Sequence, residues 1–306
     1  MPQIILTLPA AALLERGGNE VRVFIRYNPP TFFDAPTSMT DHYAVIGNPI
    51  THSKSPLIHT LFAQQTGQDI TYQAIESPLD GFAATVARLR AEGYKGCNVT
   101  VPFKHEAFRL ATQRSGRAND ANAVNTLIFE GDEILGDNTD GVGLMNDIDK
   151  NLQYKLFLKD ALILGAGGAA AGVMWPLFNA GVGIIVANRT LEKAQKLAEP
   201  FEGAGTVFAR TYEGLAGRRF DIVINATSSG LTDDLPPLPD GLFKPGALAY
   251  DMMYGKETPF MAFARKQGAA VISDGLGMLV EQAATAFALW RKVRPDTRPV
   301  LEKLRG

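Results

Sequence analysis

From residue 43 onward, short apolar runs alternate with longer segments of helical periodicity. The apolar runs have the length of buried strands and cover residues 43–46, 96–101, 161–164, 183–187, 221–225, 247–251 and 269–273. The helical segments between them include residues 56–66, 79–92, 169–180 and 191–199. Apolar strands that alternate with helices are typical of mostly parallel sheets covered on both faces. The pattern therefore predicts an α/β protein.

Length and local composition divide this pattern into parts. The chain has 306 residues. Single hydrophobic cores stop growing at roughly 250–300 residues, so two domains are expected. A boundary is predicted within residues 140–151, before a glycine-rich turn that opens a second α/β unit. Residues 1–38 differ from the rest, because they contain Pro-Pro, Gly-Gly and Asn-Pro pairs and no sustained hydrophobic period.

We therefore expect residues 1–38 to be a disordered or non-native N-terminal extension, with Met39 as the natural start. A genuine flexible tail is the alternative. A signal peptide over residues 4–14 is disfavoured, because no Lys or Arg precedes this apolar segment and Glu15 follows it at once.

Charge and cysteine content argue against several classes of partner. The 30 Lys and Arg residues are balanced by 32 Asp and Glu residues, so no basic excess exists to bind nucleic acid. No run of about 20 apolar residues is present, so no membrane span is expected. Cys97 is the only cysteine, which excludes an intrachain disulfide and fits a reducing compartment such as the cytoplasm. None of the four histidines stands in a zinc-binding frame, so no metal is expected.

A glycine-rich turn follows the predicted strand at residues 161–164. Before a helix of small residues, the chain reads Gly165, Ala166, Gly167, Gly168 and Ala169. Glycines in this context permit a tight turn and let the diphosphate of a dinucleotide approach the helix N-terminus. A turn that only packs a helix on a strand is the alternative.

The end of the next strand indicates which dinucleotide is bound. Sites for NAD place Asp or Glu there, to accept a hydrogen bond from the ribose 2′-hydroxyl. Here Asn188, Arg189 and Thr190 occupy that position, and Lys193 follows three residues later. Arg189 can bind a 2′-phosphate through two N–H groups, Thr190 can donate a hydroxyl and Lys193 adds a positive charge. The sequence predicts NADP; two solvated cations at the start of a surface helix are the alternative.

Polar residues also gather after three other predicted strands, where ligands bind in open α/β sheets. Ser53 and Ser55 precede a helix expected to start at Pro56, so Ser55 either caps this helix or binds a ligand. Lys104 lies in the first turn of another predicted helix, where its charge opposes the helix dipole. Such an unfavourable placement of a positive charge is expected at functional sites. The alternative is an exposed lysine whose side chain bends toward water. Residues 136–141 are predicted to form a turn.

Taken together, these segments resemble shikimate dehydrogenases. Residues 43–56, with Gly-Asn-Pro-Ile followed by Ser-Lys-Ser-Pro, resemble the opening signature of that family. Residues 98–104, Asn-Val-Thr-Val-Pro-Phe-Lys, resemble its catalytic lysine motif. Further segments match in the same order: 123–126, 136–141, 165–169, 188–190, 225–230 and 274–280. The resemblance extends from about residue 40 to the C-terminus.

The resemblance implies both a fold and a reaction. The reaction is the reversible, NADP-dependent reduction of 3-dehydroshikimate to shikimate, in the pathway to chorismate and the aromatic amino acids. The fold is a two-domain α/β fold, with a substrate-binding α/β domain and a Rossmann-type NADP-binding domain. The first is expected over residues 40–140 and 275–306, and the second over residues 141–274. The expected partner is a small-molecule substrate, and the protein is expected to act as a monomer or homodimer.

The resemblance also implies the residues of the site. Lys104 and Asp140 would be the catalytic pair. The substrate would be bound by Ser53, Ser55, Thr100, Asn125, Asp140, Tyr254 and Gln282. The cofactor would be bound by Gly165, Ala166, Gly167, Gly168, Ala169, Asn188, Arg189, Thr190, Lys193, Thr227, Gly275 and Met278.

Two positions depart from the family pattern, and two other functions stay open. Asn122 stands where Gly often precedes Ala-Val-Asn-Thr, and Lys193 stands where Arg often ends the 2′-phosphate motif. An enzyme that also oxidises quinate is one alternative, although Arg189 argues against NAD as its cofactor. A non-catalytic shikimate sensor is the other, but such a protein would be expected to lack Lys104 or Asp140.

Overall fold

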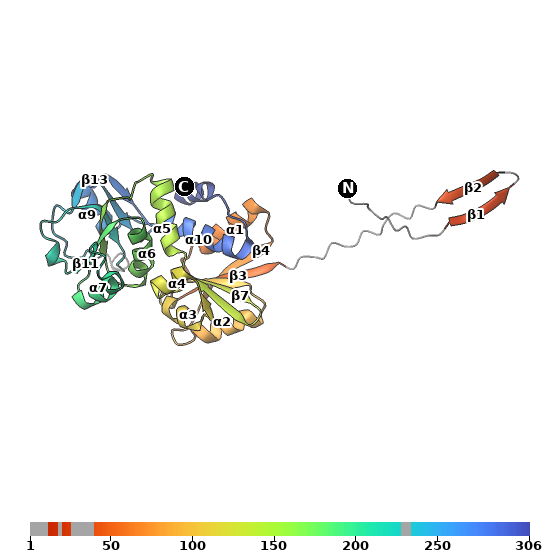
Figure 1. Ribbon diagram of the computed structural model, residues 1–306, viewed down its shortest axis with the longest axis horizontal. Helices are drawn as coiled ribbons and strands as arrows, with labels where there is room; N and C mark the ends of the chain where they lie inside the picture. The colour runs from red at the N-terminus through yellow and green to blue at the C-terminus, as the bar shows by residue number, and fades with distance from the viewer. Residues whose placement is uncertain (1–11, 18–19, 26–39, 228–233) are drawn as a thin grey trace. The chain divides into compact units, whose positions relative to one another are not determined.

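The computed structural model describes residues 12–17, 20–25, 40–227 and 234–306 (Figure 1). The chain divides into two compact units, Met1–Met39 and Thr40–Gly306. In the first unit, β1 (Ala12–Gly17) pairs antiparallel with β2 (Glu20–Ile25). Most of the disordered or non-native extension expected over residues 1–38 lies outside the described residues, and this expectation stays untested.

The first sheet of the second unit combines parallel and antiparallel strands. In spatial order its strands are β4 (Ile70–Glu76), β3 (Asp41–Gly47), β5 (Gly96–Val99), β7 (Thr126–Glu130), β8 (Glu133–Asp137) and β6 (Gln113–Arg114). β3 pairs parallel with β4 and β5, whereas β7 runs antiparallel to both of its neighbours. The accompanying helices are α1 (Ser55–Thr66), α2 (Phe82–Ala91), α3 (Lys104–Leu110) and α4 (Gly116–Ala121).

The antiparallel hairpin of β7 and β8 is not predicted by the apolar pattern. Glu130 pairs with Glu133, so that Gly131 and Asp132 form a two-residue turn. Gly131 has φ of 56°, which suits the tight hairpin turns that need left-handed backbone. This one glycine allows the chain to reverse and to extend the parallel strands with an antiparallel pair.

The turn predicted over residues 136–141 is wrong. β8 ends at Asp137, and α5 (Asp140–Asn146) begins three residues later, so the segment ends a strand and starts a helix. The side chain of Asn138 accepts a hydrogen bond from the backbone N–H of Asp140, at 3.1 Å. Because the first N–H groups of a helix lack partners within the helix, this contact stabilises the abrupt start. Asp140 is thereby fixed at the start of α5, three residues after β8 ends.

The second sheet is entirely parallel. In spatial order its strands are β11 (Val207–Arg210), β10 (Gly183–Ala187), β9 (Asp160–Leu164), β12 (Phe220–Asn225), β13 (Phe243–Asp251) and β14 (Val271–Ser273). Numbered from β9, the order is 3-2-1-4-5-6, which is that of doubly wound dinucleotide-binding sheets. In such sheets ligands bind beyond the carboxyl ends of the strands, where the strand order reverses. Here that point lies between β9 and β12.

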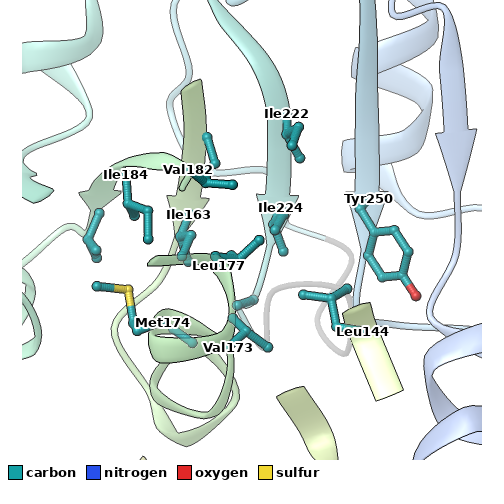
Figure 2. Close-up of a cluster of buried hydrophobic side chains, with 14 of the residues drawn as sticks. Leu144, Ile163, Val173, Met174, Leu177, Val182, Ile184, Ile222, Ile224 and Tyr250 are labelled. Carbon is teal, nitrogen blue, oxygen red and sulfur yellow. The ribbon is translucent and has the colours of Figure 1, made fainter. Parts of the chain in front are cut away.

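Helices cover this sheet and connect it to the first one. They are α5, α6 (Gly168–Asn179), α7 (Leu191–Ala198), α9 (Pro259–Lys266), α10 (Leu276–Arg291) and α11 (Arg298–Arg305), with the π-helix η1 (Asp147–Asn151) and the 3-10 turns η2 (Glu199–Phe201) and η3 (Glu213–Leu215). Ile163 on β9 and Ile222 and Ile224 on β12 lie on the face that packs against α6 (Figure 2). Leu162 and Val223 alternate with them and pack in a second cluster together with side chains of α9. The two-residue period of the strands thus buries both faces.

The close packing of α5 and α10 brings distant parts of the chain together. Gly143 of α5 lies at this contact, where a β-carbon would be only 2.7 Å from Cβ of Gln282 and 2.7 Å from the carbonyl oxygen of Met278. The absence of a side chain at Gly143 therefore allows α10 to approach. As a result, Gln282 lies beside the helix that begins with Asp140.

Candidate active site

A buried ion pair joins the starts of two helices. Lys104 is the first residue of α3, and Asp140 is the first residue of α5. Nζ of Lys104 donates to Oδ2 of Asp140 at 2.5 Å, and the two side chains are only 18% and 8% exposed. A helix N-terminus favours the negative charge of Asp140 but disfavours the positive charge of Lys104. The negative charge of Asp140 therefore offsets the unfavourable interaction between the Lys104 charge and the N-terminus of α3.

Neutral side chains hold the carboxylate of Asp140 from the other side. Nδ2 of Asn125 donates to Oδ1 of Asp140 at 2.8 Å and lies 3.3 Å from Oε1 of Gln282. Oδ1 of Asn125 accepts from the backbone N–H of Thr139 at 2.9 Å. Asn125 and Gln282 are separated by 157 positions in the chain. The fold thus brings two further predicted site residues, Asn125 and Gln282, into one hydrogen-bonded group with the Lys104–Asp140 ion pair.

The serine loop, Ser53–Lys54–Ser55, lies at the start of α1. Oγ of Ser53 accepts from the backbone N–H of Ser55 at 3.3 Å. The N-cap position of α1 is Lys54, and no side chain caps the helix, so the interpretation of Ser55 as a helix cap is wrong. Burial raises the pKa of the Tyr254 hydroxyl, and a hydrogen bond with the backbone of Lys54 acts in the opposite direction. Tyr254, which follows β13, therefore lies beside this loop.

Thr100 is placed by a close approach between β3 and β5. Its backbone N–H donates to the carbonyl oxygen of Ile46 at 2.9 Å. A β-carbon on Gly47 would lie 2.5 Å from the Thr100 methyl group, so only glycine fits there. Thr100 thus stands at the carboxyl ends of two parallel strands, where open α/β sheets bind ligands.

The sequence did not reveal a chain of buried polar side chains behind the site. The Tyr72 hydroxyl donates to Oδ1 of Asn98 at 2.7 Å. Nδ2 of Asn98 donates to the carbonyl oxygen of Asn125 at 3.1 Å and to Oγ1 of Thr126 at 3.0 Å. Burial raises the pKa of Tyr72 well above its ordinary value, so it stays a neutral donor. The only available signal was Asn98 itself, a polar residue in a short buried strand.

The glycine-rich turn after β9 leaves open space at the start of α6. Gly165 has φ of 98°, and a β-carbon there would lie 3.1 Å from the carbonyl oxygen of Ala226. Among the described residues, and leaving aside chain neighbours and the helix's own backbone, a β-carbon on Gly167 would meet no atom within 4 Å, and one on Gly168 would meet only Nε2 of His105, at 3.8 Å. In the part of the chain that the structure describes, no side chain caps α6. Uncapped N–H groups facing open space fit an anionic diphosphate.

Further residues border this turn. Oγ1 of Thr227 donates to Oδ1 of Asn225 at 2.7 Å, and its methyl group lies 3.1 Å from the β-carbon position of Gly165. Gly275, just before α10, leaves no room for a side chain, because a β-carbon would lie 2.3 Å from the carbonyl oxygen of Met252. Three predicted cofactor residues pack half-buried against the core cluster of Figure 2: Ala166, Ala169 and Met278.

The predicted 2′-phosphate residues lie together after β10. Nδ2 of Asn188 donates to the carbonyl oxygen of Thr190 at 2.8 Å and closes the turn before α7. Arg189, Thr190 and Lys193 are exposed. Burial raises the pKa of Tyr212, whereas the nearby charge of Arg189 lowers it, so the guanidinium lies close to the end of β11. Two cations and a hydroxyl at one strand end fit a 2′-phosphate.

The described part of the chain contains neither a metal-binding cluster nor a membrane-spanning helix. Among these residues, no group of three or more His, Cys, Asp or Glu side chains is placed to hold a metal ion. Within the same residues, no helix is both long enough and apolar enough to cross a membrane.

Family models match three segments of the chain. Residues 45–127 match the shikimate dehydrogenase substrate binding domain, and residues 148–232 match shikimate / quinate 5-dehydrogenase. Residues 275–305 match the shikimate 5′-dehydrogenase C-terminal domain. The first and third segments contain the serine loop, Lys104 and Gln282, and the second contains the glycine-rich turn.

Relatives and solved structures resemble nearly the whole of the second unit. The chain is 59% identical to shikimate dehydrogenase (NADP(+)) of Methylobacillus flagellatus, over 87% of this chain and 99% of that protein. It is 52% identical to an Ael1 enzyme from Pseudomonas putida, with a TM-score of 0.81 over 86% of this chain and 98% of that one. Shikimate 5-dehydrogenase of Thermus thermophilus, solved in complex with NADP(H) and shikimate, is 33% identical, with a TM-score of 0.78 over 87% and 98% of the two chains.

The fold and the site define an NADP-dependent oxidoreductase, in which a substrate-binding α/β domain is combined with a Rossmann-type NADP-binding domain. The family follows from the identity and coverage of the relatives. The chain belongs to the shikimate dehydrogenase family. The fold class, the family and the cofactor predicted from the sequence are thereby confirmed.

Proposed function

We propose that this chain catalyses the reversible, NADP-dependent reduction of 3-dehydroshikimate to shikimate, in the pathway to chorismate and the aromatic amino acids. The observation that carries the proposal is the buried Lys104–Asp140 ion pair, in which Nζ and Oδ2 are 2.5 Å apart. It supplies a proton donor and an oriented acceptor next to neutral side chains suited to a polyhydroxylated acid.

Lys104 and Asp140 share the catalytic work. When bound, NADPH supplies a hydride to the C3 carbonyl carbon of the substrate. The Lys104 ammonium donates a proton to the carbonyl oxygen, so that one hydride and one proton complete the reduction. Asp140 accepts a hydrogen bond from the ammonium, keeps it oriented and accepts another from the adjacent substrate hydroxyl. In the oxidation of shikimate, the neutral Lys104 amine takes the proton back.

Neutral donors and acceptors hold the substrate. Ser53 and Ser55 donate hydroxyl hydrogen bonds to the carboxylate, and Tyr254 adds its phenol beside the same loop. The other proposed contacts to the substrate are Thr100, Asn125, Asp140 and Gln282. A site built from such groups discriminates against analogues that lack the matching oxygens, because its own polar groups are then left unpaired.

The proposed cofactor residues fall into three groups. The diphosphate is held by the turn and first helical residues Gly165, Ala166, Gly167, Gly168 and Ala169. The 2′-phosphate is held by Asn188, Arg189, Thr190 and Lys193. The nicotinamide end is held by Thr227, Gly275 and Met278.

The proposal also covers the domain boundaries, the cellular compartment and the oligomeric state. Residues 40–140 and 275–306 form the substrate-binding domain, and residues 141–274 form the NADP-binding domain. The protein works in the cytoplasm as a monomer or homodimer. Cys97 supports a reducing compartment, because it is the only cysteine and is buried, and burial raises the pKa of its thiol.

The test is the initial rate of shikimate oxidation, measured side by side with NADP+ and NAD+ and with quinate as a second substrate. Shikimate with NADP+ is expected to be fastest by at least about tenfold in kcat/KM. Lys104→Ala is expected to lose at least about 100-fold in kcat, because a general acid contributes roughly that much. Lys95→Ala is the matched control, since Lys95 is an exposed lysine before β5.

Each outcome has a distinct meaning. Equal rates with quinate would overturn the proposed substrate preference, and equal rates with NAD+ would overturn the role of Arg189. Binding of shikimate without hydride transfer would identify a sensor in place of an enzyme.

A further inference from the structure

His105, the residue after the proposed catalytic lysine, faces the start of α6 from a different part of the fold. Its Nε2 lies 3.8 Å from the β-carbon position of Gly168 and, the helix's own backbone and the chain neighbours aside, is the only atom of the described residues within 4 Å of it. Gly168 is the first residue of α6, whose first turn carries no acidic or basic side chain. His105 is therefore an ionisable side chain that borders the start of α6.

The orientation of the His105 ring is fixed by Asn122. Nδ1 of His105 lies 2.8 Å from the carbonyl oxygen of Asn122. A carbonyl oxygen can only accept, so Nδ1 carries the hydrogen and Nε2 is left as the second functional atom. Nε2 has no hydrogen-bond partner among the described residues. The ring thus has one nitrogen committed to the protein and the other available at the start of α6.

Asn122 can hold the ring because of its backbone conformation. It ends α4 with φ of 46° and ψ of 36°, and its N–H donates back to the carbonyl oxygens of Ala118 and Asn119. Asn is one of the few residues with a side chain that adopts this left-handed conformation readily. The helix therefore ends sharply, and the Asn122 carbonyl is exposed toward α3. The departure at Asn122 noted in the sequence is thus structurally linked to His105.

We propose that Nε2 of His105 donates a hydrogen bond to the cofactor diphosphate, so that a residue next to the catalytic lysine also binds the cofactor. This rests on the proposed placement of the diphosphate at Gly165–Gly168. Backbone N–H groups of α6 would bind the diphosphate, and the protonated imidazole of His105 would add a charged donor. Both nitrogens of a protonated imidazole ring are donors, so Nε2 can donate to the diphosphate while Nδ1 keeps its contact with Asn122.

The experiment separates the two ring nitrogens. In His105→Asn, the amide replaces Nδ1 and keeps a donor for Asn122, whereas in His105→Gln the amide reaches the position of Nε2. The dissociation constant of NADP+ is measured by titration calorimetry. His105→Asn is expected to weaken binding about fivefold to tenfold, as for loss of one charge-assisted hydrogen bond, and His105→Gln only about twofold. Asn122→Gly is the matched control, because it keeps the carbonyl and the left-handed backbone; it is expected to bind NADP+ as the wild type does.

Adenosine 2′-monophosphate provides the second readout. It carries the adenosine and the 2′-phosphate of the cofactor but lacks the diphosphate, so both His105 variants are expected to bind it with unchanged affinity. Wild-type affinity of His105→Asn for NADP+ would overturn the inference, and so would a parallel loss of affinity for adenosine 2′-monophosphate. Failure of the wild type to bind NADP+ is a different result, because it would overturn the cofactor site itself.

Discussion

Asp140 and Arg189, the charged residues proposed for the chemistry and for cofactor choice, lie in opposite environments. Asp140 is buried and has hydrogen-bond partners on α3, before β7 and before α5. Arg189 is exposed at the end of a strand, with Lys193 exposed on the following helix. A buried, fully hydrogen-bonded group holds its geometry before any ligand arrives, whereas exposed side chains order around the ligand. The fold therefore fixes the reacting groups more firmly than the groups that select the cofactor.

This difference predicts which kinetic constant each region controls. Preorganised groups act mainly in the transition state, so their loss lowers kcat. Exposed groups that bind a remote part of the cofactor act equally in ground and transition states, so their loss raises KM. Substitutions in the two regions can therefore test the comparison directly.

The largest effect is expected for Asp140→Asn. The amide cannot accept from the Lys104 ammonium as a carboxylate does, so the proton donor loses its orientation and its charge partner. We expect kcat to fall by about 10²–10³, the range for loss of one preorganised electrostatic group, with little change in the KM for NADP+. Initial rates of shikimate oxidation measure both constants.

Asp137→Asn is the matched control for this substitution. Asp137 is also buried and ion-paired, with Arg117 at 2.5 Å, but it has no proposed role in the reaction. This variant is expected to lose stability while keeping kcat near that of the wild type. An Asp140→Asn enzyme that retained kcat within about threefold would contradict the assignment of Asp140.

Arg189→Ala is expected to have an intermediate effect. The KM for NADP+ should rise about tenfold to thirtyfold, while kcat and the kinetics with NAD+ stay nearly unchanged, because NAD+ lacks the 2′-phosphate. Lys196→Ala, which removes another positive charge from α7, is the control for nonspecific electrostatics. A large drop in kcat would mean that this exposed region also positions the reacting atoms, and the comparison between the two regions would fail.

Features determined by neighbouring residues could be predicted from the sequence. The role of Gly165 to Gly168 is predictable because a tight turn between a strand and a helix needs glycines in series. Lys104 is a predictable functional residue because a positive charge in the first turn of a helix is unfavourable, and Lys104 does begin α3. These signals depend on residues that lie within one turn of each other.

Contacts between distant segments could not be predicted in this way. The hydrogen bond of Asn125 to Gln282 depends on how α10 packs on α5, and nothing near either residue encodes it. The same holds for Tyr72 and Asn98, which meet only because β4 and β5 flank β3 in the sheet. The role of Ser55 is ambiguous in the sequence for a related reason. A serine before a helix can cap the helix or bind a ligand, and only the three-dimensional structure distinguishes these two roles.

His59 lies in the buried region around Tyr72, and it shows that burial there also has an unfavourable contribution to the free energy of folding. Its ring is fully buried and stacks on Tyr72, with centroids 4.1 Å apart and planes inclined by 3°. In the described part of the chain, neither ring nitrogen has a hydrogen-bond partner. Burial lowers the pKa of His59 from 6.5 to about 3, although the nearby Asn98 amide acts in the opposite direction. The folded protein therefore keeps this ring neutral where an unfolded chain would protonate it.

The smallest predicted effect concerns how stability depends on pH. Below pH 6.5 the unfolded chain binds a proton at His59 that the folded protein excludes, down to a pH of about 3. The contribution of His59 to stability is thus fully present above pH 6.5 and falls by about 1.4 kcal/mol for each pH unit below it. His59→Phe keeps the stacked ring and removes the titration. Between pH 7.5 and 5.5, urea unfolding should show the wild type losing about 1.4 kcal/mol more than this variant.

Phe287→Leu is the control, because it alters the packing of a ring that contacts His59 without changing any charge. It should lower stability at both pH values but leave the loss on acidification equal to that of the wild type. If His59→Phe lost as much stability as the wild type over the same interval, His59 would not be excluded from protonation in the folded state. Burial would then not keep the ring stacked on Tyr72 neutral, and the rigidity inferred for the hydrogen-bonded residues behind Asp140 would lose this support.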